Sequence, residues 1–365
     1  MRDRIKLVLL YGGRSGEHEI SLVSAASVLA HLDANRYEIT PVGMDKQGRC
    51  FVNDYETLLR HKESLPVKTE HAKAIPSLLV NGCFFMEADV VFPMVHGPLY
   101  EDGCLQGLLG LANVAFVGSD VLSSAIGMDK DMTRRLVCNE RIQAASYRVF
   151  TWTDNKEKQH DFAKKIANEL GWPVFVKPCA MGSSVGIHKV DNHADLINAL
   201  SDARRYDTVI LVEAQVEGRE IELAVLESAE SATEPYVSNP GEIKINHRDG
   251  YYSYAAKYLD SDCTDLIVPA TFANTEMVSR LQAIAREVFV GLKCKGMARV
   301  DFFVDESRDV IYLNEINTLP GFTPISMYPR LWEAEGIDYA QLLDRLIALA
   351  MMHYRNHNKL VRHYQ

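Results

Sequence analysis

The segment MARVDFFVDESRDVIYLNEINTLPGF, Met297 to Phe322, decides the fold of this chain, because its pattern predicts a β-hairpin with charged groups on one face. Alternation along a strand groups three side chains on one face of the first strand: Arg299, Asp301 and Phe303. Four side chains share one face of the return strand: Ile311, Leu313, Glu315 and Asn317. A turn near Ser307 predicts that Arg299 lies opposite Glu315, with Asp301 diagonal to it.

This hairpin face gathers three hard oxygen donors, Asp301, Glu315 and Asn317, beside the cation Arg299. Mg²⁺ prefers a few protein carboxylates completed by substrate phosphates, so we predict a metal site here. The competing interpretation is a solvated strand face with a surface ion pair. Apolar neighbours on the face and the rigid T-L-P-G-F that follows favour the metal site.

A second motif, VKPCAMGSSVG at 176–186, has the composition of a phosphate-binding loop. Lys177 ends an apolar strand and supplies a point charge. Gly182, Ser183 and Ser184 allow backbone N–H groups to approach phosphate oxygens closely. The lysine precedes the glycine and no G-K-[ST] follows, which excludes a Walker A loop. Taken alone, such a glycine-serine loop is more often an ordinary turn.

Two weaker signals flank this region. EGREIE at 217–222 follows an apolar strand, so Glu213 and Glu220 are candidates to reach an adenine amine and ribose hydroxyls; the alternative is ordinary exposed acids. GYYSYAAKYLD at 250–260 contains four tyrosines and one lysine, which is typical of a loop that closes over a site and excludes water. The alternative for this segment is an aromatic edge strand.

The order of expected elements divides the chain into three units. Strands expected at 5–10, 37–44, 88–95 and 115–117 alternate with helices, which predicts a parallel sheet with right-handed crossovers. A helix expected at 128–139 opens the second unit. From Arg219 onward strands dominate, which predicts an α+β unit on an antiparallel sheet. We therefore expect domains at 1–125, 126–213 and 214–365.

Composition excludes several classes of protein. The formal net charge of −10 argues against a nucleic-acid or anionic-membrane partner, because either favours a basic face. The seven cysteines are odd in number and form no C-x-x-C, which indicates reduced thiols. The first apolar run is too short for a signal peptide, and no later run approaches ~18 apolar residues. We expect a soluble cytoplasmic protein.

Taken together and in order, the motifs resemble one family. The motifs are GGRSGEHEISL (12–22), VHG (95–97), EDGCLQG (101–107), MDK (128–130), VKPCAMGSSVG, YAAKY (254–258) and NEINTLPGFTPIS (314–326). They resemble the D-alanine–D-alanine ligases of the ATP-grasp superfamily over most of the chain. The resemblance implies a three-domain ATP-grasp fold with an N-terminal Rossmann-like parallel-sheet domain that binds substrate, a small central domain, and an antiparallel-sheet C-terminal domain with the metal site and lid.

The resemblance also implies an activity. Two D-alanine molecules would be joined to D-alanyl-D-alanine, with ATP converted to ADP and phosphate through a D-alanyl phosphate intermediate. The product would serve peptidoglycan synthesis, and hence cell-wall biogenesis and cell shape. The family suggests a cytoplasmic homodimer with D-alanine and ATP as its small-molecule partners.

Roles at the nucleotide follow from the resemblance residue by residue. Phosphates would be held by Lys130, Lys177 and the loop of Gly182, Ser183 and Ser184. Lys257 would touch the γ-phosphate, and Glu213 and Glu220 would bind adenosine. Two Mg²⁺ or Mn²⁺ ions would bind Asp301, Glu315 and Asn317.

Roles at the amino acids follow in the same way. Glu17, aided by His96, would hold the ammonium of the first D-alanine, and Ser183 and Tyr258 would join Glu17 in closing the lid. Arg299 and the N–H of Gly321 would form an oxyanion site. Ser326 and Met327 would receive the carboxylate of the second substrate.

The sequence departs from the family pattern in two places. Tyr100 replaces a common glycine, and we expect it to reshape the loop beside His96. Ser253 and Ala255 stand in the lid where a carboxylate is common. Three alternatives remain: a ligase of the same fold for D-serine or D-lactate, a different ATP-grasp carboxylate–amine ligase, and a catalytically silent ATP-binding regulator. The A-K-Y lid favours D-alanine.

Overall fold

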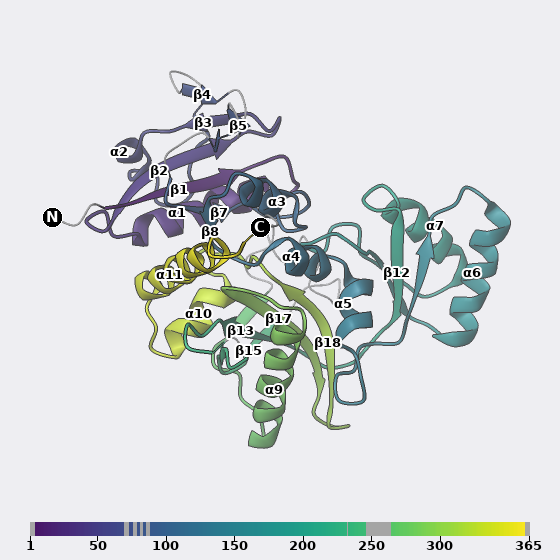
Figure 1. The fold of residues 1–365 in the computed structure, drawn as a ribbon. Coiled ribbons are helices and arrows are strands. Elements are labelled where there is room, and N and C mark those ends of the chain that lie inside the picture. Colours follow the sequence, from purple (N-terminus) through teal and green to yellow (C-terminus); the bar gives the residue numbers. More distant parts are fainter. Residues whose placement is uncertain are drawn as a thin grey trace.

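The computed structural model contains three main β-sheets that follow one another along the chain (Figure 1). It describes residues 4–68, 73–75, 79–80, 83–84, 88–231, 233–245 and 264–361. The predicted lid residues Lys257 and Tyr258, and their neighbours Ser253 and Ala255, lie outside these ranges.

The first sheet has the order β4-β3-β2-β1-β7-β8. The last four strands in this order are parallel: β1 (Ile5–Gly12), β2 (Tyr37–Met44), β7 (Val90–Met94) and β8 (Ala115–Phe116). Two antiparallel strands extend one edge, β3 (Cys50–Val52) and β4 (Lys73–Ile75). The helices of this part are α1 (His18–His31), α2 (Tyr55–Leu58) and α3 (Cys104–Leu111), and β5 (Leu79–Val80) pairs with β6 (Cys83–Phe84). The expected parallel sheet is present, with an antiparallel edge that was not predicted.

The second sheet is antiparallel, in the order β11-β10-β12-β9. Its strands are β9 (Tyr147–Thr151), β10 (Val174–Pro178), β11 (His188–Val190) and β12 (Val209–Ala214). Helices α6 (Lys156–Glu169) and α7 (His193–Ala203) share a core with it, because their apolar stripes bury Ala163, Ile166 and Leu196 against Val174, Val176 and Val212.

The third sheet is also antiparallel, in the order β16-β15-β13-β17-β18, with β14 beside β13. Its strands are β13 (Arg219–Leu226), β14 (Tyr236–Val237), β15 (Gly241–Ile245), β16 (Thr264–Ile267), β17 (Met297–Asp305) and β18 (Val310–Asn317). Helix α9 (Thr275–Gly291) seals one face through Met277, Leu281 and Phe289. The opposite face carries polar side chains such as Glu222 and Asp301, and part of it, including Leu226, packs in the core that contains Tyr328.

The end of the chain returns to the first sheet. Helices α10 (Met327–Ala334) and α11 (Tyr339–His357) share one apolar core with β1 and α1 (Figure 1). His31 stacks on Tyr339 with ring centroids 4.2 Å apart, and Arg36 and Tyr37 both bond the carboxylate of Asp344. The first and last segments therefore form one packed unit.

The register of the β17–β18 hairpin differs from the prediction. Arg299 pairs with Asn317, and Asp301 pairs directly with Glu315. A β-bulge follows, because Phe302 pairs with Leu313 and Asn314 is the extra residue. A bulge shifts the alternation by one position. The prediction that Ile311 and Leu313 share the face of Glu315 is therefore wrong, since both lie in the core with Phe302.

The helix expected at 128–139 is present as α5 (Lys130–Val137), and an additional helix, α4 (Val121–Met128), precedes it. Asp129 separates them and caps α5, because its carboxylate accepts from the N–H groups of Asp131 and Met132, each at 3.0 Å. No helix in the described ranges has the length and apolarity needed to cross a bilayer. The described cysteines carry free thiols: Cys50, Cys104, Cys138, Cys179 and Cys294.

Candidate active site

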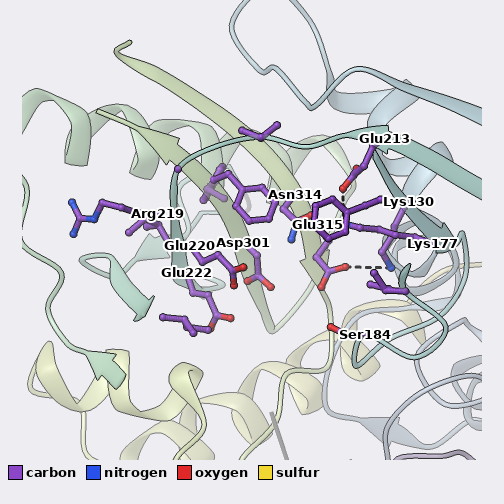
Figure 2. A pocket seen from close by; sticks show the side chains of 18 of the residues that line it. Lys130, Lys177, Ser184, Glu213, Arg219, Glu220, Glu222, Asp301, Asn314 and Glu315 are labelled. Atoms are coloured by element: carbon purple, nitrogen blue, oxygen red, sulfur yellow. Dashed lines mark ion pairs between the residues drawn. The ribbon is translucent and has the colours of Figure 1, made fainter. Parts of the chain in front are cut away.

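Two adjoining cavities lie where the three sheets meet. The first, of about 360 Å³, lies between the second and third sheets, and Figure 2 shows its charged lining. The second, of about 760 Å³, lies between the third sheet and the loops of the first. Both volumes fit small-molecule sites. Their common wall includes Lys130, Gly182, Ser183 and Glu315.

The structure brings the described predicted residues to these cavities. The first cavity is lined by Lys130, Lys177, Gly182, Ser183, Ser184, Glu213, Glu220, Asp301 and Glu315. The second is lined by Glu17, His96, Arg299, Asn317, Gly321, Ser326 and Met327, together with the common wall. Residues from five separate motifs thus converge on one place.

The glycine-serine loop between β10 and β11 forms part of the common wall. Ser183 and Ser184 both have positive φ, 51° and 57°, a region that side chains disfavour. The Ser183 hydroxyl donates to the carboxylate of Glu17, and the ammonium of Lys130 donates to the carbonyl of Met181 at 2.7 Å. Contacts from two other parts of the chain therefore hold the loop in this conformation.

Buried ion pairs surround the first cavity. The Lys130 ammonium lies 3.2 Å from Glu315, and the Lys177 ammonium lies 2.6 Å from Glu213. Glu213 is also bonded by Arg134 at 2.6 Å. Burial raises the pKa of Glu213, but the charges of Lys177 and Arg134 outweigh it and lower the pKa to about 2. Glu213 is therefore an anion throughout the physiological pH range.

Arg299 lies at the boundary of the second cavity, on β17. Its guanidinium donates two hydrogen bonds to Asp301, at 2.8 and 2.7 Å, and lies 3.0 Å from Glu222 of β13. Burial lowers the pKa of this guanidinium, but Asp301 and Glu222 raise it overall. A permanent cation is thus fixed in place by two carboxylates.

Glu17 and His96 come from two loops of the first sheet. Glu17 is buried at the N-terminus of α1. His96 Nδ1 lies 3.2 Å from Glu101, and its Nε2 lies 3.3 Å from the Ser24 hydroxyl. Burial lowers the pKa of His96, whereas the hydrogen bond to Glu101 and the charge of Glu17 raise it overall. The two side chains form an anionic and hydrogen-bonding end of the second cavity.

The Tyr100 side chain contacts Arg14, Met44 and Gly13. Its hydroxyl accepts a hydrogen bond from the N–H of Arg14 at 2.9 Å and contacts the sulfur of Met44 at 3.1 Å. Its ring covers Gly13, where an added Cβ would lie 2.8 Å from the ring. The side chain that replaces the usual glycine therefore packs on the glycine turn that leads to Glu17.

The N-terminus of α10 also lines the second cavity. Ser326 precedes the helix, and its hydroxyl accepts from the N–H of Thr323 at 2.9 Å. Gly321 lies so close that a Cβ there would be 3.0 Å from the Ser326 hydroxyl. Free N–H groups and the helix dipole make such an end attractive to a carboxylate.

The three side chains predicted to bind a metal lie on the β17–β18 hairpin. Asp301 and Glu315 are cross-strand partners, and Asn317 follows on the same strand. In the described part of the chain, no three His, Cys, Asp or Glu side chains are grouped so that they could hold a metal. Two carboxylates and one amide fit Mg²⁺, which takes its remaining ligands from phosphates and water.

Three residues that the sequence interpretation missed also belong to this region. Arg134 follows Lys130 by four residues, a spacing that places both on one helix face and was readable from the sequence. Glu222 follows from strand alternation after Glu220. Asn314 lines the first cavity only because of the bulge, and Figure 2 shows its side chain beside Glu315. No local signal indicates that bulge.

A parallel α/β sheet followed by two antiparallel sheets that enclose a cavity of lysines and carboxylates defines an ATP-grasp ligase fold. Residues 6–119 match the family model "D-ala D-ala ligase N-terminus", and residues 136–348 match "D-ala D-ala ligase C-terminus". The chain belongs to the D-alanine–D-alanine ligase family, and the fold predicted from its motifs is confirmed.

Comparisons with individual relatives agree with this family assignment. The chain is 58% identical to the D-alanine–D-alanine ligase of Legionella pneumophila strain Lens, over 100% of both sequences. The solved D-alanine–D-alanine ligase of Coxiella burnetii is 33% identical with a TM-score of 0.81, covering 98% of this chain and 97% of that one. The VanG D-Ala:D-Ser ligase of Enterococcus faecalis is 32% identical with a TM-score of 0.78, covering 95% and 100%.

Proposed function

We propose that this protein joins two D-alanine molecules to D-alanyl-D-alanine, with ATP converted to ADP and phosphate. The observation that carries the proposal is the common wall of the two cavities. A nucleotide in the first cavity would present its γ-phosphate at Lys130, Ser183 and Glu315, where an amino acid in the second cavity can reach it. Such a shared wall is what direct phosphoryl transfer requires.

The first step activates a carboxylate. Lys130, Lys177 and the 182–184 loop would hold the phosphates, with Glu213 and Glu220 at adenosine. A carboxylate oxygen of the first D-alanine attacks the γ-phosphorus, the bond to the bridging oxygen breaks, and ADP leaves with that electron pair. The product is D-alanyl phosphate, whose phosphate is a far better leaving group than oxide.

The second step forms the peptide bond. Glu17 and His96 would hold the ammonium of the first D-alanine, while Ser326 and Met327 would receive the carboxylate of the second. The amine of the second D-alanine, after its ammonium has lost one proton to solvent, attacks the acyl carbon, and the nitrogen loses a second proton as the amide forms. Arg299 and the Gly321 N–H would stabilise the resulting oxyanion, before the carbon–oxygen bond breaks and phosphate leaves. One such donor contributes about 3 kcal/mol.

Charge explains why so many cations are needed. A carboxylate and a phosphate charge at ~4 Å repel by about 4 kcal/mol at an effective dielectric of 20. Two Mg²⁺ or Mn²⁺ ions on Asp301, Glu315 and Asn317 would neutralise the phosphates and orient them. Lys130, Lys177 and Lys257 would supply further charge. Tyr258, with Ser183 and Glu17, would close the lid and exclude water.

The setting of the enzyme is part of the proposal. We expect activity in the cytoplasm, in peptidoglycan synthesis. We also expect three domains, at 1–125, 126–213 and 214–365.

We also expect a homodimer. Its contact would use an apolar patch on α3 and α4, where Leu111 is 84% exposed and Val121 and Leu122 are about half exposed. Light scattering should give twice the chain mass, and Leu122→Lys should weaken the dimer.

A direct assay tests the activity. Purified protein with Mg²⁺ and ATP should release ADP only when D-alanine is added, and mass spectrometry should detect the dipeptide. Absence of ADP release would contradict the proposal. Because VanG is similar over 95% of the chain, D-serine and D-lactate should be offered in competition. Predominance of a mixed product would favour the alternative ligase of the same fold.

A further inference from the structure

Arg134 is a fully buried cation on α5 that no step above uses. Its side chain is 2% exposed, although it carries a permanent charge. It follows Lys130 by one helical turn on the same helix face, and its partner Glu213 lines the first cavity. The next residue, Arg135, is 62% exposed and pairs with Asp131 on the surface. Two adjacent arginines therefore lie in opposite environments.

The contacts of Arg134 centre on one carboxylate. Its Nη2 donates to Glu213 Oε2 at 2.6 Å and to the carbonyl of Asn314 at 3.4 Å, and its guanidinium carbon lies 5.0 Å from the centre of the Tyr147 ring. Among the described residues, Nε and Nη1 have no hydrogen-bond partner although both are buried. Burying a guanidinium with unmet donors costs stability. Packing alone does not explain an arginine at this position.

The sum of the charges around Glu213 indicates a role for Arg134. Glu213 Oε1 lies 2.6 Å from the Lys177 ammonium, while Oε2 is bonded to Arg134. Two cations and one anion leave a net positive charge around Lys177, the ammonium that is expected to hold phosphates in the first cavity. Without Arg134, the cluster would be neutral, and the charge of Lys177 would be fully taken up by a buried carboxylate.

We propose that Arg134 is a positioning residue that balances the charge of Glu213, so that the ammonium of Lys177 remains available to nucleotide phosphates. The proposal rests on the proposed function, because it assumes that the first cavity holds ATP. It assigns to Arg134 an effect on nucleotide affinity and no direct contact with D-alanine, since Arg134 does not line the second cavity.

Three single variants test it. Arg134→Met removes the charge and should raise the KM for ATP and the dissociation constant for ADP at least tenfold, with the KM for D-alanine within about twofold. Arg134→Lys keeps the charge and should restore both nucleotide constants to within about threefold. Arg135→Met is the matched control and should change neither. Thermal unfolding and calorimetric ADP titration accompany the kinetics.

A double-variant cycle separates charge balance from packing. In a Glu213→Gln background there is no carboxylate to balance, so adding Arg134→Met should change the ADP dissociation constant by less than about threefold. An equally large effect in both backgrounds would overturn the proposal, as would equal increases in the KM for ATP and for D-alanine. If Arg134→Met does not fold, Arg134→Gln takes its place in the cycle.

The experiments distinguish failure of the proposed ligase function from failure of the proposed role of Arg134. Wild-type protein that binds ADP but forms no dipeptide would refute the proposed function while leaving the ADP titrations to decide on Arg134. Dipeptide formation together with unchanged nucleotide constants in the neutral Arg134 variant would refute the role of Arg134 alone.

Discussion

Replacing Glu213 with glutamine should remove part of the pH dependence of folding stability. The folded chain holds the pKa of Glu213 at about 2, because the charges of Lys177 and Arg134 outweigh the burial, whereas an unfolded chain titrates it near 4.5. The sign follows from proton uptake: below pH 4.5 the unfolded chain binds a proton that the folded chain does not. Stability supplied by this carboxylate is therefore complete above pH 4.5 and decreases as the pH falls towards 2.

The magnitude follows from the same two pKa values. The loss reaches about 1 kcal/mol at pH 3.5 and about 3 kcal/mol near pH 2. At neutral pH the variant should be less stable by roughly 3–5 kcal/mol, because two buried cations then face each other without their carboxylate. Between pH 5.5 and 3.5, the stability difference between wild type and variant should shrink by about 1 kcal/mol.

Urea unfolding at both pH values, followed by the fluorescence of the three tryptophans, measures this difference. Glu234→Gln is the control, because Glu234 is largely exposed and lies 3.8 Å from Arg286; as a surface carboxylate it should change the free energy of unfolding much less than Glu213→Gln does at neutral pH. If the difference in unfolding free energy between wild type and Glu213→Gln is the same at pH 5.5 and at pH 3.5, the pKa of Glu213 is not lowered in the folded chain. The charge cluster described above would then be wrong.

Three further predictions concern activity. Glu315→Gln should abolish ATP turnover with the circular dichroism spectrum intact; wild-type turnover would remove Glu315 from the metal site. Chelation by EDTA should stop ADP release, and Mg²⁺ or Mn²⁺ should restore it; full activity in EDTA would refute the metal requirement. Gly97→Ala should raise the KM for D-alanine at least tenfold and leave the KM for ATP unchanged, because the new Cβ would lie 2.6 Å from a Glu17 oxygen at a φ of +82°. A normal KM for D-alanine would mean that Glu17 does not hold the substrate.

Much of the fold was predictable because it depends on local periodicity. Alternation along 297–304 correctly separated Val300 and Phe302, which lie in the core, from Arg299 and Asp301, which line the cavities. Apolar runs predicted the parallel strands β1, β2 and β7 with ends close to those observed. Short elements such as β3 and β11 were missed, since three residues carry too little pattern.

The bulge in the β17–β18 hairpin is a feature that the periodicity of the sequence does not predict. Pairing of Asp301 with Glu315 rather than a diagonal placement depends on one extra residue, Asn314. A bulge arises from how two strands twist against their neighbours, which the sequence of one hairpin does not specify. The break between α4 and α5 was, in contrast, readable in principle, because Asp129 has the side chain and position of an N-cap.

The sequence by itself determined the order of the sheets, the family and the motifs that carry chemistry, because each depends on residues close together in the chain. Tertiary structure alone decided which charges meet: Arg134 with Glu213, Lys177 with Glu213, and Arg299 with Glu222. These partners lie on different elements. Their contacts form only when the sheets pack together, because a buried charge is costly unless an opposite charge lies beside it.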